Sequence, residues 1–143
     1  FCVNQIIDLS QKSKIEVRRD ATSLLCRVMN DYNDELQKNI NVFIAIQHLA
    51  RDYDYQINYV ISKHLIGFLK NYPERKDDIL QVIYILLRKS SRERREITEN
   101  TLDSVKVFTK LYPKYKSEII SRLKRFFKKT ADPLLENTIF DLK

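Results

Sequence analysis

Apolar residues recur three and four positions apart along this chain, which is the spacing of one face of an α-helix rather than of a β-strand. The 143 residues include one Gly and three Pro, too few breakers for a fold built of many tight hairpins. We therefore predict an all-α fold. The expected helices span residues 1–10, 14–31, 34–51, 55–71, 74–89, 94–111, 114–130 and 133–143.

The apolar pattern repeats with a period of 40 residues. Pro73 and Pro113 are likewise separated by 40 residues, and each can take the first position of a new helix. An ordinary helical bundle with an accidental self-match is the alternative interpretation. The positions in register are Val17, Ile57 and Ile97; Leu25, Leu65 and Val105; Val28, Phe68 and Phe108; Tyr32, Tyr72 and Tyr112; Ile40, Leu80 and Ile120; Phe43, Ile83 and Leu123; and Ile46, Leu86 and Phe126.

Two helices in each unit of this length favour an α-solenoid, in which stacked hairpins supply the core. We predict a single domain, a right-handed α-solenoid of about four antiparallel helix hairpins, with the apolar positions of residues 17–28 and their repeats buried along a seam. Apolar surface is expected at one or both ends. The repeats are placed at about 1–33, 34–72, 73–112 and 113–143, with turns inside the hairpins near 11–13, 52–54, 90–93 and 131–132.

Two of these turns carry the spacing of a capping box. Ser13 precedes Glu16 by three residues, and Ser90 precedes Glu93 in the same way. In such a box the serine hydroxyl accepts from an amide that would otherwise lack a partner at the start of the helix. We expect both serines to cap the helices that follow them.

The segment Val17-Arg18-Arg19-Asp20-Ala21, followed by Leu24-Leu25, resembles the second helix of a HEAT repeat. The segment Asp132-Pro133-Leu134-Leu135 resembles the turn that enters that helix. The positions equivalent to Arg18 hold Asn58 and Thr98, where the family carries Arg; armadillo and other helical-hairpin arrays share much of this pattern. The resemblance implies a scaffold that binds proteins, as HEAT arrays do in trafficking, nuclear transport and chromosome or RNA-processing complexes.

Positive charge is concentrated in the second part of the chain, which carries a formal net charge of +7 overall. Residues 1–54 hold seven Lys and Arg against eight Asp and Glu, whereas residues 55–143 hold nineteen against eleven. Turns of stacked hairpins share one edge and lie about 10 Å apart. We expect a contiguous basic edge that binds an anionic partner; the alternative is a solvated helix face. The candidate residues are Arg88, Lys89, Arg92, Arg94, Arg95, Arg122, Lys124, Arg125, Lys128 and Lys129.

The sequence shows no catalytic or metal-binding constellation. His48 and His64 lie on different expected helices, and neither has a second His or Cys three or four residues away. Asp77 and Asp78 point about 100° apart on a helix, so they cannot share a proton, and we expect them to complement the helix dipole. We predict a protein that is not an enzyme and that uses no metal and no cofactor.

Cys2 and Cys26 lack the C-x-x-C spacing and are expected to be free thiols in a reducing compartment. No apolar run approaches the roughly 20 residues of a membrane span. We predict an intracellular protein, cytoplasmic or nuclear. Because the chain begins at Phe1 and stops at Lys143 within an apolar-periodic segment, we expect it to be a piece of a longer protein.

These observations favour a non-catalytic scaffold that binds a partner protein or an assembly through its helical faces and the basic edge. The first alternative is binding of nucleic-acid phosphates by that edge without base readout. A HEAT-like DNA glycosylase is a weaker alternative, since the resemblance implies a base pocket furnished with Trp and the chain has none. A helical domain for phosphorylated peptides and self-association through uncapped terminal repeats are further alternatives.

Overall fold

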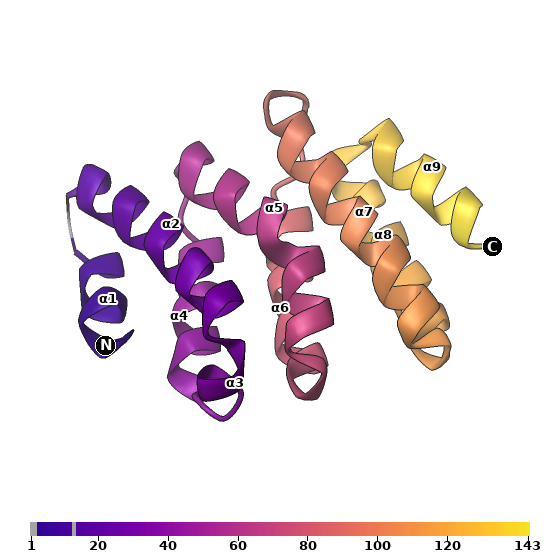
Figure 1. Cartoon of the computed structure of the whole chain (residues 1–143). Helices are drawn as coiled ribbons and strands as arrows, with labels where there is room; N and C mark the ends of the chain where they lie inside the picture. The colour runs from indigo at the N-terminus through magenta and orange to yellow at the C-terminus, as the bar shows by residue number, and fades with distance from the viewer. Residues whose placement is uncertain (1–2, 13) are drawn as a thin grey trace.

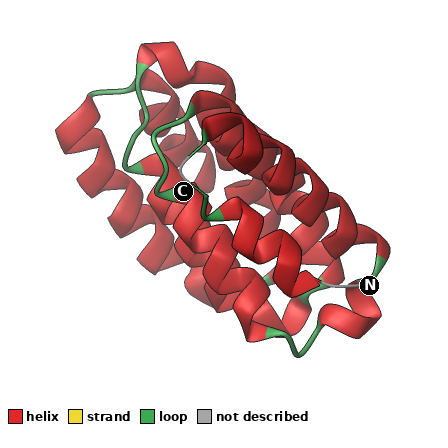
Figure 2. Cartoon of the chain, turned by 90° about the vertical axis from the view of Figure 1, so that its left-hand side faces the viewer, coloured by secondary structure: helices red, strands yellow, loops and turns green. Residues whose placement is uncertain are grey.

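The computed structural model describes residues 3–12 and 14–143, and these form helices joined by short turns (Figure 1). Within these ranges the chain forms no strand, as Figure 2 shows, and the all-α prediction is confirmed. Single 3₁₀ turns at Pro73–Arg75, Arg92–Arg94 and Pro113–Tyr115 precede three of the helices. The helices are α1 (Val3–Ser10), α2 (Ile15–Asp31), α3 (Asn33–Leu36), α4 (Ile40–Ala50), α5 (Tyr55–Asn71), α6 (Lys76–Leu87), α7 (Arg95–Leu111), α8 (Lys116–Thr130) and α9 (Pro133–Leu142).

The helix boundaries agree with the apolar pattern except in one place. The expected helix over 55–71 coincides with α5, but the single helix expected over 34–51 is wrong, because α3 and α4 are separate. The interruption comes from Asn39, which adopts an extended backbone and whose side chain accepts a hydrogen bond from the amide of Asn41. This is the geometry of an N-cap, so the helix starts anew at Ile40.

The helices lie in two rows (Figure 1). In one row α2 packs on α5, α5 on α7, and α7 on α9. In the other, α1 packs on α4 and α4 on α6, and α8 meets α6 through an edge-to-face contact between Tyr84 and Phe126. Consecutive helices α1–α2, α4–α5, α6–α7 and α8–α9 therefore form hairpins that connect the rows.

The core follows the predicted seam between neighbouring hairpins. Phe43, Phe68 and Tyr72 form an edge-to-face cluster at its centre. The predicted burial of Val17 is wrong, because this side chain is half-buried. Its helix, α2, stands at the end of the row, whereas Ile57 lies on α5, which has a helix of the same row on each side. The seam residues that are buried as predicted are Leu25, Val28, Ile57, Leu65, Phe68, Ile97, Val105 and Phe108.

Apolar side chains are exposed at both ends of the rows, as expected. Ile40 and Ile44 of α4 are exposed because α1, with eight residues, covers only part of that helix. At the other end Phe140 of α9 is 79% exposed. Tyr32, although in register with the buried Tyr72, is also exposed.

The predicted capping boxes do not describe the helix starts. Ser13 lies outside the described residues, and Ser90 is buried with no hydrogen-bond partner for its hydroxyl among the described residues, so the second prediction is wrong. The chain turns into a 3₁₀ segment after Ser91, which leaves Ser90 one residue too early to cap it. Side-chain caps are formed instead by Asn39, Asp54 and Asp132.

The cysteine of the core is a free thiol. Cys26 is buried, and burial raises its pKa to about 12, so the thiol stays protonated at neutral pH. Cys2 lies outside the described residues. None of the helices in the described ranges has the length and apolar character needed to cross a membrane.

Candidate functional site

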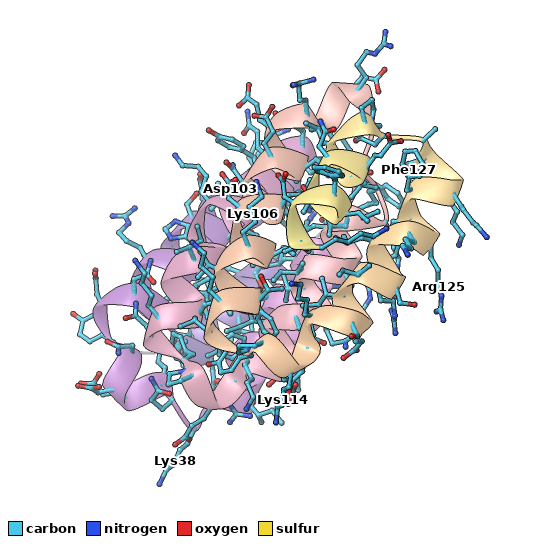
Figure 3. The ribbon with its side chains drawn as sticks, turned by 90° about the vertical axis from the view of Figure 1, so that its right-hand side faces the viewer. Lys38, Asp103, Lys106, Lys114, Arg125 and Phe127 are labelled. Atoms are coloured by element: carbon cyan, nitrogen blue, oxygen red, sulfur yellow. The ribbon has the colours of Figure 1, made fainter. Side chains whose placement is uncertain are left out.

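A groove rich in cations runs between the end of α6 and the outer side of α8. Its volume is about 550 Å³. We call it the basic groove, and its lining residues are Arg88, Arg122, Arg125, Phe126, Lys128 and Lys129. Among these described residues none is acidic. Figure 3 shows Arg125 extending from the outer edge of α8 toward solvent.

The cations of α8 share one side of the helix because of their spacing. Arg122, Arg125 and Lys129 follow one another at intervals of three and four residues, while the apolar residues of the opposite side face the core. Lys128 and Lys129 also lie in the last turn, where cations interact favourably with the helix dipole. The local sequence of α8 is therefore sufficient to present a row of positive charge.

The floor of the basic groove is aromatic and buried. The Arg122 guanidinium lies over the Tyr84 ring, 4.9 Å from its centroid, a cation–π contact that holds this arginine in place. The Tyr84 hydroxyl is buried without a hydrogen-bond partner in the described part of the chain, and burial together with the nearby Glu118 raises its pKa to about 12. Tyr84 is thus a neutral support for Arg122.

Lys89 does not belong to the basic edge, and that prediction is wrong. We call the contact between hairpins α4–α5 and α6–α7 the second junction; Lys89 points into it. Its Nζ donates to Ala50 O at 2.6 Å, to Asp52 O at 2.7 Å and to Asn58 Oδ1 at 2.7 Å. These oxygens at the end of α4, in the turn and on α5 draw the ammonium inward. Burial and the neighbouring Arg94 lower the pKa of Lys89 to about 8.

Arg94 was also predicted to belong to the basic edge, and that prediction is wrong. Its guanidinium donates to the same Asn58 Oδ1, and its Nε is buried without a partner among the described residues. Burial lowers the pKa of this arginine from its ordinary value. Two cations therefore converge on one neutral amide, and neither is free to bind a partner.

Arg92 and Arg95 are brought together away from the basic groove. They line a separate hollow of about 280 Å³, formed with Ser91 and the turn from Thr130 to Leu134. Asp132 also lines this hollow, and Arg95 is paired with Glu99 at 2.8 Å. Because acids offset the two arginines, the hollow is a weaker anion site than the basic groove. Lys124 is exposed on α8 but does not line either of them.

A second basic concavity was not predicted. It has a volume of about 400 Å³ and is lined by Lys106, Lys110 and Lys116 together with Asp141, which pairs with Lys106 at 3.5 Å. In Figure 3, Lys106 lies on α7 beside α9. The four-residue spacing of Lys106 and Lys110 is visible in the sequence and could have indicated this hollow. The packing of α9, which brings Asp141 to the hollow, is not visible there.

The residues considered for catalysis have structural partners. Asn30 Nδ2 lies 2.9 Å from Nδ1 of the half-buried His64, and burial lowers the pKa of this histidine. Asp77 and Asp78 lie in the first turn of α6, as predicted, and Asp77 accepts a hydrogen bond from the Tyr115 hydroxyl at 2.8 Å. His48 is exposed beside α1. Contacts within the fold therefore account for the positions of His64 and Asp77.

Comparison with known proteins finds no family model, no curated sequence and no solved structure that matches this chain. The resemblance to HEAT repeats therefore rests on the sequence segments 17–25 and 132–135.

Proposed function

We propose that this chain is a non-catalytic interaction segment, a HEAT-like α-solenoid that binds an anionic partner through its helical faces and the basic groove. The observation that carries the proposal is the groove itself, where five cations from α6 and α8 meet with no acidic residue in the described lining. Crowded cations repel one another, and a bound anion relieves that repulsion. A larger intracellular complex fits this role, with a partner protein at the helical faces and an anionic component at the basic groove.

The arrangement of the helices supports the solenoid part of the proposal. Each hairpin packs on its neighbours in chain order, and the repeated apolar positions fall between the hairpins. In such an array each unit depends on its neighbours for burial. Native-state hydrogen exchange should therefore open hairpins α1–α2 and α8–α9 at lower free energy than α5 and α6. A single opening free energy for all helices would contradict the solenoid.

The binding part is tested by reversing charge at exposed positions. The variant R88E/R125E/K128E/K129E changes only exposed residues of the groove lining and leaves out Lys89 and Arg94, whose side chains hold the second junction. Surface changes of this kind alter stability by about 0.5 kcal/mol or less each. Binding of the chain to an anionic polymer, such as polyglutamate or heparin, should weaken at least tenfold and lose most of its salt dependence. Equal affinity of parent and variant would show that the groove is a solvated face.

A further inference from the structure

The basic groove differs in composition from the interface that a protein partner usually requires. Cores of protein interfaces are depleted in Lys, and most of their binding energy comes from a few Trp, Tyr and Arg side chains that enter pockets. Among the described lining residues Phe126 alone is apolar, and it is only 6% exposed. Interfaces with nucleic acids are much more positive than interfaces between proteins. The lining therefore favours a phosphate-bearing partner at this site.

The cations match the spacing of a phosphate backbone. Arg122 and Lys129 are seven positions apart, which is about 10 Å along α8 at a rise of about 1.5 Å per residue. One strand of a duplex advances about 3.4 Å per nucleotide along the duplex axis, so a row of this length laid along that axis covers about three nucleotide steps. Arg88 lines the groove from the end of α6, across from this row.

The groove offers no means of stacking exposed bases. The rings of Tyr84 and Phe126 are buried beneath it, and Tyr84 is covered by the Arg122 guanidinium. Binding of single strands relies on aromatic faces that are open to the bases. Asn and Gln, which pair with adenine edges, are also missing from the described lining. The lack of open aromatic faces favours a duplex over a single strand, and the lack of amides argues against readout of adenine.

We infer that the basic groove binds the phosphate backbone of a nucleic-acid duplex without reading its sequence. The inference rests on the proposed function and names the class of partner. Arg125, Lys128 and Lys129 are exposed and contact successive phosphates of one strand, while Arg88 contacts it from the α6 side. Arg122 contributes charge from a fixed position over Tyr84.

The experiment compares two variants that lose the same charge. The groove variant is R88Q/R125Q/K129Q, and the matched control is K110Q/K114Q/K116Q, which neutralises exposed lysines away from the groove. Fluorescence anisotropy measures binding to two DNA duplexes of different sequence and about 20 base pairs, to one of the single strands, and to polyglutamate, over a range of salt concentrations. Circular dichroism and thermal melting confirm that both variants are folded.

We expect the parent chain to bind both duplexes equally and more tightly than the single strand. Its affinity should fall about 100-fold between roughly 50 and 200 mM salt, as for about four phosphate contacts. The groove variant should lose about three units of the salt slope, while the control keeps most of the affinity and the slope.

Other results overturn the inference in distinguishable ways. If both variants weaken duplex binding alike, overall charge and not the groove is responsible. If polyglutamate binds at least as tightly as the duplexes and only the groove variant loses it, the nucleic-acid inference is wrong and the proposed anionic partner remains. If the parent binds none of these probes, both the inference and the basic-groove part of the proposed function are wrong.

Discussion

At the first junction, between hairpins α1–α2 and α4–α5, arginines on α2 meet carboxylates in the following turn. Arg18 Nε donates to Asp52 Oδ2 at 2.9 Å, and Arg19 holds both oxygens of Asp54 at 2.8 and 3.0 Å. At the second junction the charges are arranged the other way. Asn58 on α5 is the acceptor, and the cations Lys89 and Arg94 come from the segment between α6 and α7.

This difference shows how the same packing tolerates two kinds of polar contact. At the first junction each cation has its own anion, so the hydrogen bonds from Arg19 lower the pKa of Asp54. At the second, two cations share one amide oxygen and backbone carbonyls, and burial lowers the pKa of both. The first junction is stabilised by matched charge, whereas the second depends on keeping a neutral amide in place.

The largest effect should come from the helix that both junctions share. Phe68 of α5 is buried against Phe43 and Tyr72. Phe68→Ala should lower the free energy of unfolding by about 3–5 kcal/mol, because it leaves a cavity in the seam. Urea denaturation measures this loss, with Phe140→Ala on the exposed side of α9 as the control. A loss under about 1 kcal/mol for Phe68→Ala would mean that the seam is wrong.

Asn58→Leu breaks the second junction and also removes the hydrogen bonds that Asn58 Nδ2 donates to Leu49 O and Ala50 O within the α4–α5 hairpin. The change removes the acceptor for Lys89 and Arg94 and leaves these cations partly buried without it. We expect a loss of about 2–3 kcal/mol by urea denaturation, since buried donors without partners are costly. Asn137→Leu, at an exposed position of α9, is the control and should change stability by about 0.5 kcal/mol or less. Equal losses of stability for Asn58→Leu and Asn137→Leu would show that the second junction does not stabilise the fold.

Asp54→Ala tests the first junction. It removes both the partner of Arg19 and the N-cap of α5, which accepts from the amide of Ile57. We expect a loss of about 1–2 kcal/mol at pH 7, mostly from the cap. Because the folded pKa of Asp54 lies below its ordinary 3.8, the part of this contribution that needs the charged carboxylate is present above that pH and is lost as the pH falls below it. Unfolding at pH 7 and near pH 3 measures both effects, with exposed Asp20→Ala as the control. A deficit of the same size at both pH values would show that the carboxylate charge contributes nothing.

The smallest effect concerns the protonation of Lys89. Its folded pKa is about 8, below the ordinary 10.5, so between these values the unfolded chain binds more protons and stability rises with pH. Lys89→Met should remove this rise, an effect below about 1 kcal/mol because the side chain is only partly buried. Denaturation of parent and variant at pH 7 and pH 10 measures the difference. Parallel pH profiles would contradict the buried position of Lys89.

Much of the fold could be predicted because its signals are local. The apolar spacing located α5 at its observed limits, and the same spacing predicted the row of cations on α8. The exceptions have identifiable causes. Asn39 divides the expected helix over 34–51 through a side-chain cap, and the terminal position of α2 leaves Val17 half-buried. Neither cap geometry nor the absence of a packing neighbour is visible in periodicity.

The candidate site was only partly predictable, since basic residues close in sequence have different surroundings. Arg88 and Lys89 are adjacent, yet Arg88 lines the basic groove and Lys89 is bonded to oxygens of the preceding hairpin. Side chains of adjacent helical residues point about 100° apart. Which of the two points to solvent depends on where the neighbouring hairpin packs.

The amino-acid sequence by itself determined the helices, their apolar sides and the excess of positive charge, because these depend on residues within one or two helical turns of each other. The tertiary structure alone decided which cations reach a partner. Lys89 and Arg94 are withdrawn by acceptors 31 to 39 residues away, whereas Arg125 remains exposed. Burying a cation is favourable only where oxygens are already placed to receive it, and the packing of one hairpin on the next places them.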